Sequence, residues 1–177
     1  FGIEAAAPET GYGYIERAKA IQSGYHVARF VEKPDLEQAQ AYVDSGQYYW
    51  NSGMFVFQSQ TFLTALKAHA PLIAQYTETA WQDRRVDQAF IRPNPKAFED
   101  CPAESVDYAV MEVAKRVAVV PLSAGWSDIG SWQSLWTVSN KDSDLNVSKG
   151  DVIFENTANS LVFAENRLVT VVGLEEV

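Results

Sequence analysis

Trp126-Ser127-Asp128-Ile129-Gly130-Ser131-Trp132 places one carboxylate between two indoles, just after an apolar run and just before an expected helix. A carboxylate on such a strand-to-helix turn suits Mg²⁺, which takes one or two carboxylates, keeps several waters and adds substrate phosphates. The turn therefore predicts that Asp128 is a metal ligand in an α/β chain. The alternative is that Asp128 caps the helix that begins near Ser131. We interpret Trp126 and Trp132 as core residues rather than as ligand-stacking ones.

Upstream of this turn, the chain predicts a series of strands and helices. Segments 12–21 and 25–32 are β-prone, and Gln22-Ser23-Gly24 between them is typical of a hairpin turn. Apolar residues at helical spacing predict an amphipathic helix over 35–45, with Pro34 in its first turn and Gly46 after its end. The spaced residues are Leu36, Ala39 and Val43. Next come an expected strand over 53–57, helices opening at Ser59 and Pro71, and a loop over 92–102. A further helix is expected after Ser105, followed by a strand over 117–122. The residues that this helix should bury are Val106, Ala109, Val110 and Val113.

The character of the sequence changes near residue 139. A polar stretch over 139–144 is typical of a linker, and helical patterns stop beyond it. Three short apolar runs parted by polar turns then predict the strands of a meander or of a small solenoid-like β element. These runs are 152–154, 161–164 and 168–172. The expected organisation is a domain over 1–138, a linker over 139–150 and the start of a β-rich region over 151–177.

Composition argues against several classes of protein. A chain of 177 residues with 47% hydrophobic content can bury a core. Its net charge of -9 disfavours nucleic acid as a partner. No apolar run approaches the ~20 residues that span a bilayer, so no membrane segment is expected. Cys101 is the only cysteine, which favours a reducing cytoplasmic location, and His26 and His69 stand too far apart in sequence to suggest zinc.

Five motifs occur along the chain in the order found in one family of enzymes. The chain resembles the sugar-nucleotide pyrophosphorylases, and among them the bacterial mannose-1-phosphate guanylyltransferases, including the bifunctional type with a mannose-6-phosphate isomerase domain. The resemblance covers nearly the whole chain. The motifs are Pro8-Glu9-Thr10-Gly11-Tyr12-Gly13-Tyr14-Ile15, Phe30-Val31-Glu32-Lys33-Pro34, Trp50-Asn51-Ser52-Gly53-Met54-Phe55-Val56-Phe57, Ser105-Val106-Asp107-Tyr108-Ala109-Val110-Met111-Glu112 and the Trp/Asp/Gly/Trp turn.

The resemblance implies an activity and a fold. The activity is nucleotidyl transfer from GTP to mannose 1-phosphate, which gives GDP-mannose and pyrophosphate for polysaccharide biosynthesis. The fold is a three-layer α/β arrangement around a mixed sheet. The family's Gly-rich phosphate loop does not occur between Phe1 and Val177. We therefore expect the chain to lack the N-terminal nucleotide-binding half and to be inactive by itself. We also expect it to belong to a homo-oligomer.

The Glu-Lys-Pro motif supplies the first candidate site residues. The resemblance implies that Glu32 accepts hydrogen bonds from sugar hydroxyls, while Lys33 contacts phosphate and is catalytic together with Asp128. It also implies that Asp128 binds Mg²⁺ with an aspartate of the N-terminal half. The alternative for Glu32 and Lys33 is a surface ion pair. Side chains at successive strand positions point to opposite sides unless the strand breaks, and Pro34 favours such a break.

Other candidates lie in the remaining motifs. Gly13 resembles the glycine whose backbone lies against the sugar, and Gly11 and Tyr14 are further candidates for sugar binding; turn or bulge geometry is the alternative. Asn51 offers a donor and an acceptor suited to adjacent hydroxyls, or else forms an Asx-turn. Asp107 is typical of a carboxylate at a helix start, although the family places this helix near the active site.

Three other functions are compatible with the sequence. One is nucleotidyl transfer to glucose 1-phosphate, and another is a non-catalytic regulatory homologue that binds a sugar nucleotide. A structural assembly domain with a β tail is the third. The presence of Glu32, Lys33 and Asp128 together favours an enzyme, because a regulator has no need of the metal ligand.

Overall fold

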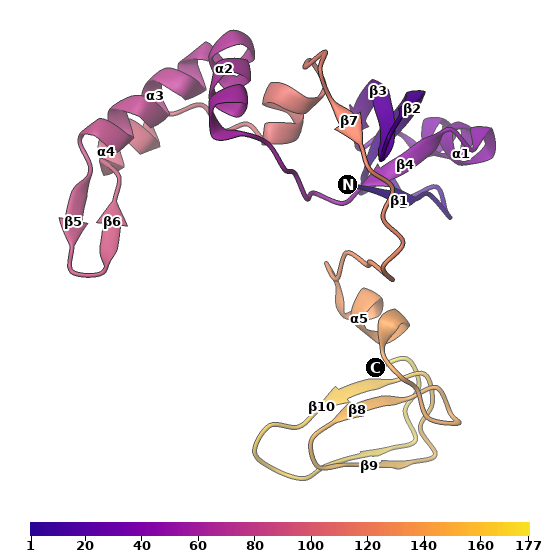
Figure 1. The fold of residues 1–177 in the computed structure, drawn as a ribbon. Helices are drawn as coiled ribbons and strands as arrows, with labels where there is room; N and C mark the ends of the chain where they lie inside the picture. The colour runs from indigo at the N-terminus through magenta and orange to yellow at the C-terminus, as the bar shows by residue number, and fades with distance from the viewer. The chain divides into compact units, whose positions relative to one another are not determined.

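The computed structural model describes all 177 residues, which divide into two compact units, Phe1–Ala124 and Gly125–Val177. The first unit contains an antiparallel sheet with helices, and the second contains one α-helix and parallel strand pairs (Figure 1). The α/β class predicted from the sequence is therefore confirmed. The division precedes the predicted linker at 139–150, which belongs to the second unit.

A five-stranded sheet is the centre of the first unit. Its strand order is β1-β4-β2-β3-β7, and every neighbouring pair is antiparallel. The main sheet is thus not mixed as predicted, apart from one isolated parallel bridge between Gly2 and Pro121. The predicted hairpin is confirmed as β2 and β3, with two register shifts along it. The strands are β1 (Gly2–Glu4), β2 (Gly13–Ile21), β3 (Gly24–Glu32), β4 (Tyr48–Asn51) and β7 (Ala118–Val119).

Helix α1 (Leu36–Ser45) covers one face of this sheet and confirms the helix predicted over 35–45. Its N-cap is Asp35, whose side chain accepts a hydrogen bond from the Gln38 amide, so Pro34 precedes the helix instead of occupying its first turn. Gly46 ends the helix in the left-handed region, with φ of 62°. The buried residues are Ala39 and Tyr42, whereas Leu36 is exposed.

Tyr42 is buried because aromatic rings of the sheet lie beneath it. Its ring stacks on Tyr48 with the centroids 4.1 Å apart and is tilted against Tyr14 at 5.4 Å. Tyr14 and Ile15 are consecutive in β2, so their side chains point to opposite faces of the sheet. Ile15 packs with Phe30 and Val119 in a separate core cluster. The sheet therefore has a core on each face.

Helices α2 (Ser59–His69) and α3 (Pro71–Gln82) pack together with a π-helix, η1 (Asp107–Met111). Their shared core joins Leu66, Ala70 and Ala74 to Ala109 and Val110 of η1. Met111 packs against this cluster and against the Ile15 cluster of the sheet. The π-helix thus connects the α2–α3 pair to the sheet.

Several predicted elements of the first unit are wrong or shorter than expected. Residues 53–57 form no strand; β4 ends before them at Asn51, and Val56 is exposed. The expected loop over 92–102 contains the end of a hairpin and a short helix capped by Asn94. Helix α2 opens at Ser59 as expected, although Gln58 and not Ser59 is its N-cap. Val113 is exposed, and only Ala118–Val119 of the expected strand over 117–122 is a strand. The additional elements are β5 (Arg85–Asp87), β6 (Phe90–Arg92) and α4 (Pro95–Glu99).

The second unit begins with an irregular segment and helix α5 (Trp132–Val138), followed by four short strands. Strand β8 pairs in parallel with β10, and β9 pairs in parallel with β11. Three of these strands were predicted, but β8 was missed because it contains only one apolar residue, Val147. The strands are β8 (Val147–Lys149), β9 (Val152–Glu155), β10 (Leu161–Phe163) and β11 (Val169–Val172).

The polar stretch predicted as a linker is an ordered turn in this unit. The Asp142 side chain accepts hydrogen bonds from the amides of Asp144 and Asn146. Asn146 is buried, and its side chain bonds the Thr157 carbonyl and the Ser160 amide. The polar residues thus satisfy buried backbone groups. None of the helices in either unit has the length and apolar character needed to cross a membrane.

Candidate functional site

Three predicted site residues meet where strands β2, β3 and β4 reach the same edge of the sheet. Gly13 at the start of β2 is the register partner of Glu32 at the end of β3. A Cβ atom built on Gly13 would collide with Glu32 Oε2 and lie 3.1 Å from the Asn51 Cβ. The absence of a side chain at Gly13 therefore leaves room for the carboxylate of Glu32 and the amide of Asn51.

Glu32 is the most constrained residue of this group. Its side chain is only 10% exposed, and its Oε2 atom is buried without a hydrogen-bond partner. Burial raises the pKa of Glu32, and the charges of Asp107 and Glu112 raise it further, against a lowering by Lys33. A buried acceptor without a partner is costly unless another group supplies a donor. Glu32 therefore carries an acceptor that the folded chain leaves unsatisfied.

Lys33 adopts a backbone conformation that turns the chain at the end of β3. Its φ is 49°, a region that residues with side chains rarely occupy. The Lys33 Nζ atom lies 3.5 Å from Glu32 Oε1. The strand therefore breaks where Pro34 favoured a break, and the two side chains meet instead of pointing apart. The two residues do form the ion pair of the alternative interpretation, but the pair is only partly exposed, because the Glu32 side chain is 10% exposed and the Lys33 side chain 57%.

Asn51 combines both of the roles considered for it. Its Oδ1 accepts a hydrogen bond from the Gly53 amide at 3.0 Å, which is the Asx-turn, and its Nδ2 donates to Asp107 Oδ1 at 2.9 Å. A side-chain amide has two N–H donors and two lone pairs on its oxygen. One donor and one lone pair of Asn51 therefore stay available for a ligand. Asp107 belongs to the site and is more than a carboxylate at a helix start.

Tyr14 and Gly11, which were also predicted to bind the sugar, do not belong to this group of residues. Tyr14 is fully buried, and its hydroxyl donates to the carbonyl of Glu9 at 3.0 Å. Its ring is part of the core beneath α1, so Tyr14 supports the sheet and does not face a ligand. Gly11 is exposed, and a Cβ there would meet no atom within 4 Å. No neighbouring group therefore lies so close to Gly11 that a side chain would be excluded there.

Asp128 lies in the irregular segment at the start of the second unit and is exposed. Ser131 caps helix α5, because its hydroxyl accepts a hydrogen bond from the Ser134 amide at 3.1 Å. The alternative that Asp128 caps this helix is therefore wrong. Only the Asp128 carbonyl is engaged, by the Gly130 amide at 2.9 Å. The free carboxylate fits one position of a Mg²⁺ shell completed by water and phosphate, and no cluster of three ligating side chains occurs in the chain.

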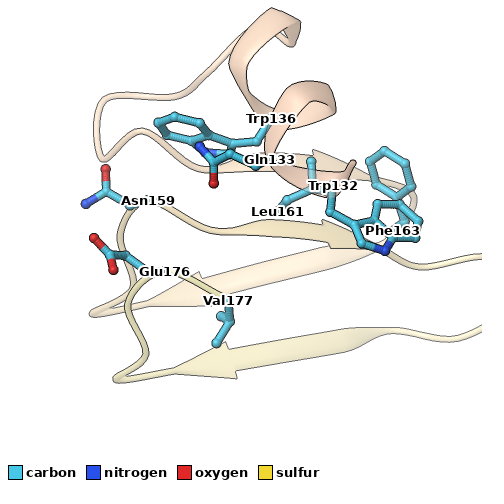
Figure 2. A pocket seen from close by; sticks show the side chains of 8 residues that line it. All are labelled: Trp132, Gln133, Trp136, Asn159, Leu161, Phe163, Glu176 and Val177. Carbon is cyan, nitrogen blue, oxygen red and sulfur yellow. The ribbon is translucent and has the colours of Figure 1, made fainter. Parts of the chain in front are cut away.

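A pocket of about 800 Å³ lies in the second unit between α5 and the strands (Figure 2). Trp132 is 72% exposed there and contacts the Phe163 ring edge-on, with the centroids 6.3 Å apart. The interpretation of Trp132 as a core residue is therefore wrong. None of the predicted site residues lines this pocket. Its lining consists of Trp132, Gln133, Trp136, Asn159, Leu161, Phe163, Glu176 and Val177.

Comparison with known proteins places the chain in a family. The sequence model of the family described as nucleotidyl transferase matches residues 1–144. The chain belongs to the nucleotidyl transferase family.

Members of known name are similar over nearly all of this chain. The mannose-1-phosphate guanylyltransferase of Escherichia coli (strain K12) is 52% identical over 99% of the chain and 38% of its own length. The alginate biosynthesis protein AlgA of Pseudomonas aeruginosa is 47% identical over 100% of the chain and 37% of its own length. The chain thus spans well under half the length of these relatives.

A solved structure is similar in fold to nearly the whole chain. A protein of Thermus thermophilus, described as a mannose-1-phosphate geranyltransferase, superimposes with a TM-score of 0.82 at 31% identity. The match covers 98% of this chain and 50% of that one. The nucleotidyl transferase sequence therefore folds here as it does in a crystallised relative.

Glu112 is the site residue that sequence reasoning missed. It follows Asp107 by five positions, a spacing that in an α-helix separates two side chains by roughly 140° around the axis. The π-helix changes this relation, because its hydrogen bonds join residues five apart. The only available signal was the second acid at the end of the Asp-Tyr-Ala-Val-Met-Glu segment.

Proposed function

We propose that the protein carrying this chain transfers a guanylyl group from GTP to mannose 1-phosphate, forming GDP-mannose for polysaccharide biosynthesis and releasing pyrophosphate. The observation that carries the proposal is the buried, unpartnered Oε2 atom of Glu32 beside Gly13 and Asn51. It supports binding of a polyhydroxylated ligand by a chain of the nucleotidyl transferase family. The names of the relatives support mannose 1-phosphate as that ligand.

The transfer demands positioning and charge neutralisation more than covalent participation of side chains. A phosphate oxygen of mannose 1-phosphate attacks the α-phosphorus of GTP, and one P–O bond forms as the bond to the pyrophosphate oxygen breaks. The rate of the transfer rises because the two reactants are held in line and because nearby groups neutralise the developing charge. In this chain Glu32 supplies a fixed acceptor for a sugar hydroxyl, which orients the ring and hence its phosphate.

Lys33 is the cation assigned to the sugar phosphate. Its ammonium lies 3.5 Å from Glu32 Oε1, so a sugar that binds Glu32 brings its phosphate within reach of Lys33. The exposed lysine side chain can move to follow that phosphate, because it is not fixed by other partners. Asn51 contributes its remaining donor and lone pair to adjacent hydroxyls.

Asp128 is the residue proposed to hold Mg²⁺. When bound, Mg²⁺ neutralises phosphate oxygens and lowers the cost of charge that develops at the phosphorus. The exposed carboxylate of Asp128 has no hydrogen bond or ion pair to lose on binding the ion. We assign no residue of this chain to GTP.

The second unit is proposed to begin a β-solenoid. Two parallel strand pairs and a further parallel bridge between Ala158 and Glu175 support this proposal, because stacked parallel strands are the repeating contact of such folds. A cytoplasmic location and a homo-oligomeric state stay predictions from the sequence.

Pyrophosphate release by the full-length protein tests the proposed activity. The assay crosses GTP, UTP, dTTP and ATP with mannose and glucose 1-phosphates in the presence of Mg²⁺. We expect turnover with GTP and mannose 1-phosphate only, lost in Glu32→Ala and in Asp128→Ala. Glu104→Ala is the matched control, because Glu104 is exposed and makes no hydrogen bond or ion pair. Release with glucose 1-phosphate would reassign the sugar, and no release with any pair would refute the activity.

A further inference from the structure

The π-helix η1 brings together two carboxylates that an α-helix would separate. The Glu112 amide donates to the Asp107 carbonyl at 3.0 Å, which is the hydrogen bond that defines a π turn. Asp107 and Glu112 consequently follow one another on the same side of the helix. π turns are rare and occur frequently at functional sites, so the departure from α-helical geometry calls for a cause.

The opposite side of η1 is fixed by packing. Ala109 and Val110 are buried against Leu66 of α2 and Ala74 of α3. This contact sets the rotation of the π-helix about its axis, because a turn of the helix would expose both apolar residues. The two carboxylates are thereby held toward the edge of the sheet where β3 and β4 end.

Each of the two carboxylates accepts one hydrogen bond from that edge. Asp107 Oδ1 receives the Asn51 Nδ2 proton at 2.9 Å, and Glu112 Oε1 receives the Glu32 amide proton at 2.8 Å. The Lys33 amide is held from another direction by the Tyr12 carbonyl at 3.2 Å. Two consecutive amides are therefore fixed where the backbone enters the unusual conformation of Lys33, whose φ is 49°.

This arrangement costs electrostatic energy within the chain. Neither Asp107 nor Glu112 forms an ion pair, and Lys33 is the one cation that forms an ion pair with Glu32. Their charges add to burial in raising the pKa of Glu32. Like charges placed together against their repulsion are typical of functional sites.

We propose that Glu112 and Asp107 are positioning residues, which use the π turn to hold the Glu32–Lys33 corner and the Asn51 amide in place for the sugar phosphate. The inference rests on the proposed function for its substrate. Glu112 acts through the backbone of Glu32 and Lys33, and Asp107 acts through the orientation of Asn51. Neither residue needs to touch the sugar.

Three variants test whether Glu112 acts as a hydrogen-bond acceptor for the Glu32 amide. Glu112→Ala removes the acceptor, and Glu112→Gln keeps a carbonyl oxygen for the Glu32 amide. Glu104→Ala removes an exposed charge that makes no hydrogen bond or ion pair. In the full-length protein we expect Glu112→Ala to lower kcat/KM for mannose 1-phosphate about 10- to 100-fold, because small misplacements of reacting groups have effects of this size. The KM for GTP should change less than about twofold. Glu112→Gln should stay within about threefold of the natural protein, and Glu104→Ala should match it.

Asp107 supplies a second pair of variants, which tests the proposal even if one Glu112 variant fails to fold. Asp107→Asn retains an oxygen for Asn51 and should be active, whereas Asp107→Ala should lose use of mannose 1-phosphate. Amide hydrogen exchange needs no variant at all: the Glu32 amide should exchange slowly in the natural protein and faster in Glu112→Ala. Equal loss of activity in Glu112→Gln and Glu112→Ala would overturn the positioning role, since charge would then matter instead of the acceptor. An unprotected Glu32 amide would also overturn it.

Failure of the proposed function is separable from failure of this inference. If the natural protein releases no pyrophosphate with GTP and mannose 1-phosphate, the proposed function fails, and hydrogen exchange at Glu32 decides the contact with Glu112. If the natural protein is active and Glu112→Ala is equally active, the proposed function stands and the positioning role is refuted.

Discussion

Glu32 is a residue whose surroundings are unfavourable for folding and suitable for binding. One carboxylate oxygen is buried without a partner, and Asp107 and Glu112 add negative charge nearby. A hydrogen bond from a ligand would remove the desolvation cost that the folded chain bears alone. At the scale of single residues, the site therefore contains one hydrogen-bond acceptor, Glu32 Oε2, that the chain itself does not satisfy.

Replacing Glu32 with Gln should stabilise the protein at neutral pH. Burial, then Asp107 and Glu112, raise the pKa of Glu32, so folding favours the protonated acid. That stabilisation is complete below the ordinary glutamate pKa and is lost as the pH rises through the raised value. Glutamine carries no charge at either pH, so Glu32→Gln should unfold at a higher Tm than the natural protein at about pH 7.5 and at a similar Tm at about pH 4. A lower Tm for Glu32→Gln at the higher pH would contradict this account.

Gly13 tests the space beside Glu32. A Cβ at this position would collide with the end of the Glu32 side chain and crowd Asn51, so Gly13→Ala should displace the carboxylate. We expect kcat/KM for mannose 1-phosphate to fall at least about tenfold with little change in Tm, because a side-chain end can move more easily than backbone. Gly11→Ala is the matched control, since that position has room for a Cβ. Similar activity of both variants would show that the position of the Glu32 carboxylate beside Gly13 does not matter for the use of mannose 1-phosphate.

The stability of a single helix depends on local contacts such as its N-cap, and a substitution can remove one of these contacts. Helix α5 begins at a cap made by Ser131, whose hydroxyl contacts the Ser134 amide at 3.1 Å and the Ser134 hydroxyl at 2.9 Å. Ser131→Ala should lower the free energy of unfolding of the second unit by about 1 kcal/mol, as loss of an N-cap does. Urea unfolding followed by tryptophan fluorescence measures this change.

Asp128→Ala separates the metal-ligand role from the capping role. Because the Asp128 side chain makes no capping hydrogen bond to α5, this variant should change the free energy of unfolding by less than about 0.5 kcal/mol. Pyrophosphate release should nevertheless be lost. Destabilisation by Asp128→Ala comparable to that by Ser131→Ala would restore the capping interpretation.

At the scale of the whole molecule, the division at Ala124 and Gly125 predicts where the chain is cut by proteases. Limited digestion of the chain with a non-specific protease, read by mass spectrometry, should cleave within 123–130 before it cleaves within 139–146. The second segment is protected by the hydrogen bonds of Asp142 and Asn146 and by Lys141, whose Nζ donates to the Thr137 carbonyl at 3.0 Å. Early cleavage at 139–146 would support the linker predicted from the sequence.

Elements with strong local signals were predictable from the sequence. The β2–β3 hairpin follows from two β-prone runs around a glycine turn, and α1 follows from helical spacing that ends at Gly46. Pro71 begins α3 as expected. Predictions were wrong where tertiary packing determines the secondary structure. Residues 53–57 are an example, because their apolar sequence favours a strand but they pair with no neighbouring strand.

The sequence alone determined the α/β class, the family and most of the candidate site, because motif residues such as Glu32 and Asn51 are recognisable by type and order. Only the tertiary structure decided which of these residues meet. It placed Tyr14 in the core and joined Asp107 to Asn51. It also revealed Glu112, because a π turn cannot be read from residue spacing and its carboxylate reaches an amide eighty positions away in sequence. Contacts across such separations depend on how strands and helices pack, and local sequence patterns carry no record of that packing.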